Sequence, residues 1–185
     1  MLTLGEPLQT QKGTKSATLK DAKGQPIKIE LRNVKSPFGA SVFGGDGTER
    51  RVNLDAAITD IDLATRLTEL GQQIIKAASQ SSEKLFKKNL SEKDVIKSYK
   101  PILRPHEVYD PKVRTKVNLD SVKVYDNSRK LRDIPDNNFR NAKLSLFCGI
   151  PSLWIMPTGA FGALVSVEAI LYDEVVEECP FTFDE

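Results

Sequence analysis

The sequence is poor in the residues on which most catalytic and metal sites depend. It contains one histidine, His106, and two cysteines, Cys148 and Cys179, that lie far apart in the chain. A zinc site needs several such ligands at short spacing. No serine or cysteine lies in a nucleophile motif that His106 would serve. We therefore expect no enzyme activity, no metal and no cofactor.

Scattered acids keep one catalytic alternative open. Asp46, Asp55, Asp60 and Asp62 are of the type that a Mg²⁺-dependent nuclease uses as ligands. Scattered acids are also typical of any soluble surface. The glycine-rich stretch 44–47 is not a phosphate loop, because no Gly-Lys-Ser/Thr follows it. A small nuclease therefore ranks last among the interpretations.

Long apolar runs are also missing. No run approaches the roughly 18 residues that a membrane helix needs. The first 21 residues lack the apolar stretch of a secretory signal. Two cysteines do not make a disulfide framework. We expect an intracellular protein in a reducing compartment, without a membrane partner.

Basic residues are absent from the C-terminal end. Seven acids and no lysine or arginine lie between Glu168 and Glu185, whereas the rest of the chain has a net charge of +9. A basic body attracts polyanions, and an acidic ending can compete for the same surface.

The chain shows a clear succession of hydrophobic patterns. Apolar residues recur at helical spacing over residues 59–78, where Thr59 or Asp60 can act as the N-cap. Shorter helical patterns cover 83–90 and 91–99, and strand patterns cover 28–34, 50–55, 113–119, 142–150, 151–157 and 162–174. This order of strands, helices and strands favours a mainly β protein with a helical insertion (α+β), built as a small antiparallel barrel or sandwich.

Basic and aromatic residues concentrate between Lys97 and Lys143, a segment that contains twelve lysines and arginines but only six acids. Single-strand binders need this combination, because cations track the phosphates while aromatic rings stack on unpaired bases, at roughly 1–3 kcal/mol per base. In the strand pattern 113–119, Arg114 and Lys116 point away from the apolar face. An ordinary solvated sheet face has the same pattern, and the sequence leaves both interpretations open.

Three aromatic residues outside that segment have different expected places. Phe147 and Trp154 lie in nearly continuous apolar strands, so we expect them in the core. Phe161 stands between glycines, which predicts either an exposed hairpin tip or a hydrophobic plug over the end of the barrel.

The last nine residues, EECPFTFDE, combine acids with Phe181 and Phe183. Many single-stranded-DNA-binding proteins of bacteria and phages end with a short acidic segment that carries phenylalanine. The layout of this chain resembles the phage replication type of that family. The resemblance implies an OB-fold barrel with a helical insertion, a basic cleft and an acidic C-terminus.

Together, the residues and the resemblance predict one OB-like domain at 1–174, with a helical insertion at about 58–99, and an acidic tail at 175–185. We expect sequence-independent binding of single-stranded DNA in replication or recombination, in the host cytoplasm if the protein is viral. The expected interface comprises Tyr99, Lys100, Arg104, Tyr109, Arg114, Lys116, Lys123, Tyr125, Arg129, Lys130, Arg132, Phe139 and Arg140.

The resemblance also implies two roles for the tail residues Phe181, Phe183, Asp184 and Glu185. They would recruit replication proteins, and they would occupy the basic cleft when DNA is absent. The alternative from another class is a viral structural or assembly protein. It would self-associate into a homo-oligomer through its strands and its C-terminal tail.

Overall fold

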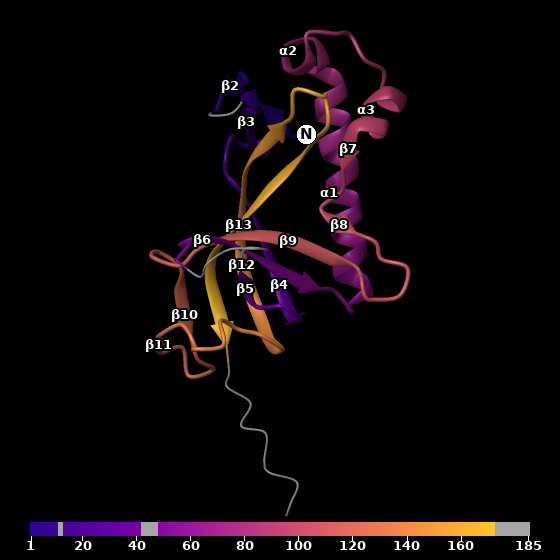
Figure 1. Cartoon of the computed structure of the whole chain (residues 1–185). Coiled ribbons are helices and arrows are strands. Elements are labelled where there is room, and N and C mark those ends of the chain that lie inside the picture. Colours follow the sequence, from indigo (N-terminus) through magenta and orange to yellow (C-terminus); the bar gives the residue numbers. More distant parts are fainter. Residues whose placement is uncertain (11–12, 42–47, 173–185) are drawn as a thin grey trace, which may run out of the picture.

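The computed structural model describes residues 1–10, 13–41 and 48–172, so the tail at 175–185 lies outside the described residues. Three helices follow one another between the strands of a single large sheet. They are α1 (Ile61–Gln80), α2 (Ser82–Phe86) and α3 (Glu92–Ser98). Figure 1 shows α1 alongside the strands, with α2 and α3 at one end. The fold is thus mainly β with an inserted helical segment.

Five long strands carry most of the pairing. They are β4 (Ile27–Ser36), β6 (Arg51–Ala57), β9 (Lys112–Asn118), β12 (Ala142–Ile155) and β13 (Phe161–Tyr172). Shorter strands extend the sheet: β1 (Thr3–Leu4), β2 (Leu8–Gln9), β3 (Lys15–Lys20), β5 (Ala40–Ser41), β7 (Tyr99–Lys100), β8 (Leu103–Arg104), β10 (Lys123–Tyr125) and β11 (Leu131–Arg132).

The pairings of the five long strands return to their starting point. β12 pairs with β4, β4 with β6, β6 with β9, β9 with β13, and β13 again with β12. A circuit of five strands cannot alternate in direction throughout, so one pair must be parallel, and that pair is β9–β13. The expectation of a wholly antiparallel sheet is wrong in this respect, since β7 and β10 also run parallel to β13.

Irregular positions in two strands explain why their sequence patterns are inexact. In β4, Arg32 and Asn33 lie opposite the single residue Ser145, and Asn33 has a φ of 52°. This β-bulge shifts the inward position from 33 to Val34. In β12, the partner changes from β4 to β3 around Pro151, which has no N–H for a ladder bond. The two strands expected at 142–150 and 151–157 are therefore one strand.

The helices begin where side chains satisfy their free N–H groups. The carboxylate of Asp60 accepts a hydrogen bond from the backbone N–H of Leu63, at 3.0 Å, and so caps α1. The hydroxyl of Ser91 accepts from the N–H of Asp94, at 3.3 Å, and caps α3. Of the two N-caps that the sequence allows for α1, the structure uses Asp60.

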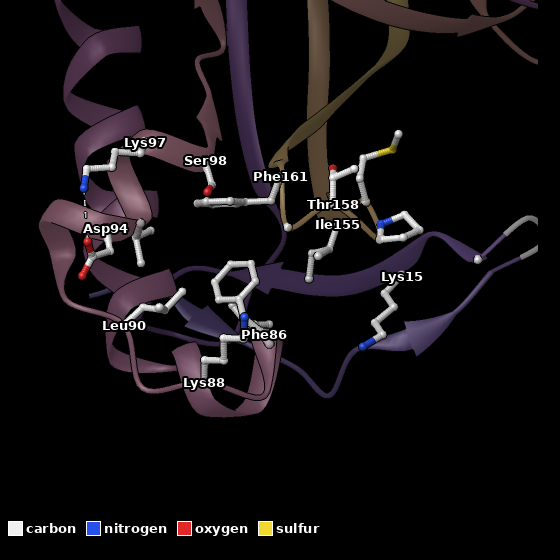
Figure 2. A pocket seen from close by; sticks show the side chains of 16 residues that line it. Lys15, Phe86, Lys88, Leu90, Asp94, Lys97, Ser98, Ile155, Thr158 and Phe161 are labelled. Atoms are coloured by element: carbon white, nitrogen blue, oxygen red, sulfur yellow. Dashed lines mark hydrogen bonds and ion pairs between the residues drawn. The ribbon is translucent and has the colours of Figure 1, made fainter.

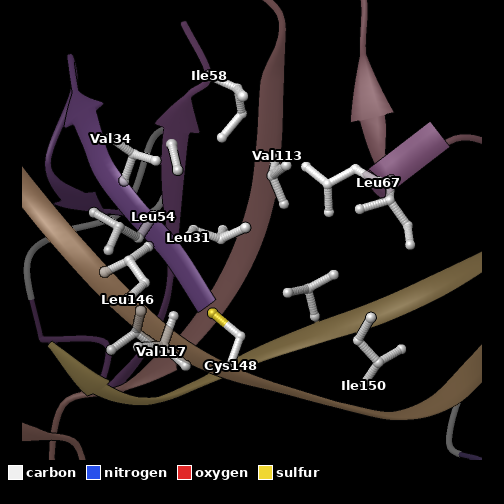
Figure 3. Close-up of a cluster of buried hydrophobic side chains, with 14 of the residues drawn as sticks. Leu31, Val34, Leu54, Ile58, Leu67, Val113, Val117, Leu146, Cys148 and Ile150 are labelled. Atoms are coloured by element: carbon white, nitrogen blue, oxygen red, sulfur yellow. The ribbon is translucent and has the colours of Figure 1, made fainter. Parts of the chain in front are cut away.

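One continuous core joins the helical insertion to the sheet. Figure 3 shows Leu67 of α1 near Val113 of β9, and Leu31, Leu54 and Leu146 meeting inside the sheet; all are buried. Full burial of each such side chain contributes about 1.5–3 kcal/mol before entropy is counted. The sheet and the helices therefore stabilise each other as one unit.

Two residues whose side chains could have a functional role, Cys148 and Phe161, are part of this core. Burial raises the pKa of Cys148 to about 12, so its thiol is neutral at physiological pH. Phe161 is fully buried, with its ring 5.3 Å from that of Phe86 and 5.4 Å from that of Tyr99. Of the two places predicted for Phe161, the structure shows the hydrophobic plug.

The cap of α1 gives a stability test. We expect Asp60→Ala to lower the free energy of unfolding by about 1 kcal/mol, because the N–H of Leu63 loses its acceptor. Thr59→Ala, one residue earlier, is the matched control and is expected to cost less than about 0.5 kcal/mol. Urea unfolding followed by circular dichroism measures both values. Equal losses in the two variants would contradict the assignment of the cap.

Candidate nucleic-acid interface

The basic segment predicted from the sequence lies along one edge of β13. β7 pairs with the first residues of β13, β9 with its middle and β10 with its end, all three in parallel. The other edge of β13 pairs with β12. β7, β9 and β10 thus lie in chain order beside one strand.

The alternation predicted for β9 is confirmed. Val113, Thr115 and Val117 are buried, whereas Arg114 and Lys116 are exposed on the outer side. On β6, Asp55 lies opposite Arg114 and Asn53 lies opposite Lys116. The outer surface of β6 and β9 is therefore polar and mostly basic, over an apolar inner side.

A carboxylate orders the centre of this surface. Arg114 donates from Nε and Nη2 to the two carboxylate oxygens of Asp55, at 3.0 and 3.3 Å. The hydrogen bond to Asp55 raises the pKa of Arg114, whereas burial and the nearby Arg114 charge lower the pKa of Arg104. Arg104 and Lys116 have no salt-bridge partner among the described residues. Asp55 thus neutralises Arg114 and leaves two cations beside it.

Two exposed aromatic rings lie at the start of β9. Phe38 is 55% exposed and Tyr109 is 65% exposed. The ammonium of Lys112 lies 4.6 Å from the centre of the Phe38 ring and 5.7 Å from that of Tyr109. His106 packs against Tyr109, and its Nδ1 accepts from the backbone N–H of Val108 and of Tyr109. The rings are therefore held near cations rather than buried.

We call this surface the basic face and define it by Phe38, Asp55, Arg104, Tyr109, Lys112, Arg114 and Lys116. Phe38 and Lys112 are not among the interface residues expected from the sequence. The sequence signal for Phe38 is its position: a large aromatic residue in the turn Ser36–Gly39, where a core side chain is not expected. Gly39 has a φ of 71°, and a Cβ there would lie 2.5 Å from the carbonyl oxygen of Asn138. This close approach places the turn that contains Phe38 in contact with the turn at 136–141. Arg140, in that second turn, is exposed.

A second group of predicted residues lies around β10. Lys123 is exposed and Tyr125 is half-buried, at positions on the same side of the strand. Tyr125 and Arg129 line a shallow groove of about 560 Å³ together with Arg32, Phe147 and Leu171. The expectation that Phe147 is a core residue is wrong, because its neighbours Leu146 and Cys148 point inward and leave Phe147 outward and 39% exposed.

The loop after β10 is organised by Asp126. Its carboxylate accepts from the backbone N–H of Lys130, at 2.9 Å, and from Nε of Arg132, at 2.8 Å. These hydrogen bonds hold the pKa of Asp126 below its ordinary value, and the bond from the Lys130 N–H has the largest effect. Arg132 is therefore paired, whereas Arg129 and Lys130 are exposed and have no salt-bridge partner within the described part of the chain.

Two aromatic residues of the predicted interface point inward. Phe139 is completely buried, edge-on to Tyr172 with 5.5 Å between ring centres, so its expected stacking on a base is wrong. Tyr99 packs on Phe161 and against Gly71 of α1, and burial raises its pKa to about 12. Lys100, next to Tyr99, is exposed. The four tail residues of the prediction, Phe181, Phe183, Asp184 and Glu185, lie outside the described residues.

Among residues 1–10, 13–41 and 48–172, no three His, Cys, Asp or Glu side chains gather as they would around a metal ion. None of the helices described is long and apolar enough to cross a membrane.

Comparison with known proteins identifies the fold. No protein-family model matches the chain, and no curated protein matches its sequence. Gp2.5, a single-stranded DNA-binding protein encoded by bacteriophage T7, has a similar structure: the TM-score is 0.56 at 12% identity, over 86% of this chain and 91% of that one.

The single-stranded DNA-binding protein from bacteriophage Enc34 is also similar, with a TM-score of 0.51 at 10% identity over 97% of this chain and 96% of that one. Its complex with single-stranded DNA gives a TM-score of 0.50 at 11% identity, over 97% and 98% of the two chains. The resemblance to phage single-stranded-DNA-binding proteins is therefore confirmed at the level of the fold, which this chain shares with them.

Proposed function

We propose that this protein binds single-stranded DNA without reading its sequence, and protects it during replication or recombination inside a phage-infected cell. The observation that carries the proposal is the basic face, where Phe38 and Tyr109 are exposed around Lys112 beside the cations of β8 and β9. The shared fold supports it, because one protein with that fold has been solved in complex with single-stranded DNA.

The chemistry of the face matches an unpaired strand. Arg104, Lys112 and Lys116 meet successive phosphates, and the Asp55–Arg114 pair fixes the guanidinium between them. The rings of Phe38 and Tyr109 stack on bases of any identity, because every base has a π-face. A base that stacks on either ring displaces the ammonium of Lys112, which then becomes available to a phosphate. The proposed role is binding, with no catalytic step.

The closed circuit of pairings supports an OB-like barrel. In chain order, β4, β6 and β9 are the first three of its five strands, and β13 pairs with the third. OB-folds bind oligonucleotides on the face formed by their second and third strands. In this chain those strands are β6 and β9, which carry the basic face. The position of the face in the fold and its chemistry therefore favour the same ligand.

The acidic tail is proposed as a competitor for the basic face. We assign one OB-like domain to 1–174, with its helical insertion at about 58–99, and a tail to 175–185. The tail has no lysine or arginine and carries Phe181 and Phe183 among acids. Its charge opposes that of the basic face, and its rings can dock on replication proteins when DNA displaces it.

The central test is a titration of labelled oligo-dT followed by fluorescence anisotropy. We expect tight binding that weakens steeply with salt. Three neutralised phosphates give a slope of about −2 in log affinity against log salt for a single strand. Lys116→Glu should reduce that slope by about one unit. A salt-independent affinity, or equal binding of a duplex competitor, would overturn the proposal.

The aromatic residues of the face have a separate test. Phe38→Ala and Tyr109→Ala should each weaken binding of oligo-dT by about 1–3 kcal/mol, with little loss of stability, because both rings are exposed. Phe139→Leu is the matched control, since it alters a buried ring: it should lower the free energy of unfolding by about 1 kcal/mol and leave affinity unchanged. If Phe139→Leu weakens binding as much as Phe38→Ala, the assignment of the two rings is wrong.

Truncation tests the tail. Removal of residues 175–185 should tighten binding of oligo-dT several-fold at low salt, because the acids no longer compete for the cations. The difference should shrink as salt rises. The same affinity for the truncated and full chains across the salt range would remove the competing role.

A further inference from the structure

A pocket outside the basic face lies where the helical insertion meets the hairpin between β12 and β13. Its volume is about 510 Å³, and its lining includes Phe86 and Leu90 from the insertion, Ile155 and Phe161 from the hairpin strands, and Lys15 from β3. Figure 2 shows these side chains around a common space, with Lys88 on the side of the insertion and Lys15 on the side of β3. Three separate parts of the fold thus build one recess.

An aromatic ring forms part of the pocket wall. Phe86 is half-buried, and its ring lies edge-on to Phe161 at 5.3 Å and 60° between ring planes. Phe161 in turn packs on Tyr99, so the ring of Phe86 rests on a buried stack. The part of Phe86 that faces the pocket is therefore held in place and is available to a flat ligand.

The rim of the pocket is positively charged. It carries Lys15, Lys88 and Lys97 against a single acid, Asp94. Asp94 pairs with Lys97 at 3.4 Å, and its pKa is lowered by the hydroxyl of Ser91 and by Lys97, so it is ionised at neutral pH. Lys15 and Lys88 have no salt-bridge partner in the described part of the chain. Two ammonium groups beside a fixed ring match one nucleotide, with its base on the ring and its phosphate at the lysines.

The pocket is continuous with the edge of β13 that carries the basic segment. Phe161, in its wall, is the first residue of β13 and pairs with Tyr99 of β7, and the next residue, Gly162, pairs with Lys100. Five residues further along β13, Ser166 pairs with Lys116 of the basic face. At 3.3 Å per residue, that separation is about 17 Å, which a few nucleotides can span. Lys100 lies exposed on the way.

We propose that this pocket binds one nucleotide of the same single strand whose middle lies on the basic face. The base stacks on Phe86, and Lys15 and Lys88 bind the phosphate. The inference rests on the proposed function and deepens it, because it adds a second contact that only a longer strand reaches. The helical insertion is then part of the binding site rather than an elaboration remote from it.

The test compares oligo-dT of about 6 and about 16 nucleotides, which lie near the lower and upper ends of the range of site sizes of an OB-fold. The double variant Lys15→Glu, Lys88→Glu should lose about tenfold in affinity for the longer strand and less than about twofold for the shorter one. The control is Lys76→Glu, Lys93→Glu, which makes the same change of charge at exposed lysines outside the pocket. It should lose less than about twofold at both lengths.

The outcomes separate the two proposals. Failure of the wild-type protein to bind either strand would overturn the proposed function, and the pocket inference with it. Normal binding of the short strand, with no loss for the long strand in the double variant, would overturn the pocket inference alone.

Photochemical cross-linking supplies an independent readout. A 4-thiothymidine at one end of the longer strand should cross-link to peptides that contain Phe86 or Met156, which also lines the pocket. Cross-links confined to β9 would overturn the inference. An acidic peptide with the sequence EECPFTFDE is the rival probe. If its binding depends on Lys15 and Lys88 while that of the long strand does not, the pocket binds a peptide and the inference is wrong.

Discussion

The pairing between β12 and β13 is the interaction on which the rest of the structure depends. It closes the circuit of strands and leaves the second edge of β13 free for β7, β9 and β10. Because the circuit has five members, one neighbouring pair must run in the same direction. That pair brings β9, with its cations, beside β13. The topology that closes the core is thus also the topology that aligns the basic segment.

The number of basic residues overstates the unpaired positive charge of the basic segment, because some of these residues form ion pairs. Twelve cations lie between Lys97 and Lys143, but Asp55 engages Arg114 and Asp126 engages Arg132. Each carboxylate neutralises the charge of its arginine and also fixes the orientation of the guanidinium group. Arg104 and Lys116 have no such partner among the described residues, so their charges remain unpaired beside the Asp55–Arg114 pair.

Much of this fold follows from local pattern. The two-residue period of 113–119 separated Arg114 and Lys116 from the buried valines correctly, and the helical period located α1. The local pattern did not predict side-chain exposure correctly where contacts with a distant segment of the chain determine it. Phe139 lies in a polar stretch, yet it packs on Tyr172, and Phe147 lies in an apolar run, yet faces outward. Phe38 owes its position to the contact between Gly39 and Asn138, which are about a hundred positions apart. No short window of the sequence contains that information.

The place of β13 in the chain has a consequence for synthesis. It is the last of the described elements to leave the ribosome, and β7, β9 and β10 all pair with it. Contacts between residues far apart in sequence also form slowly. A partly made chain therefore carries these three strands without the edge along which they align. The fold therefore completes the edge that aligns the basic segment only when nearly all of the described residues have been translated.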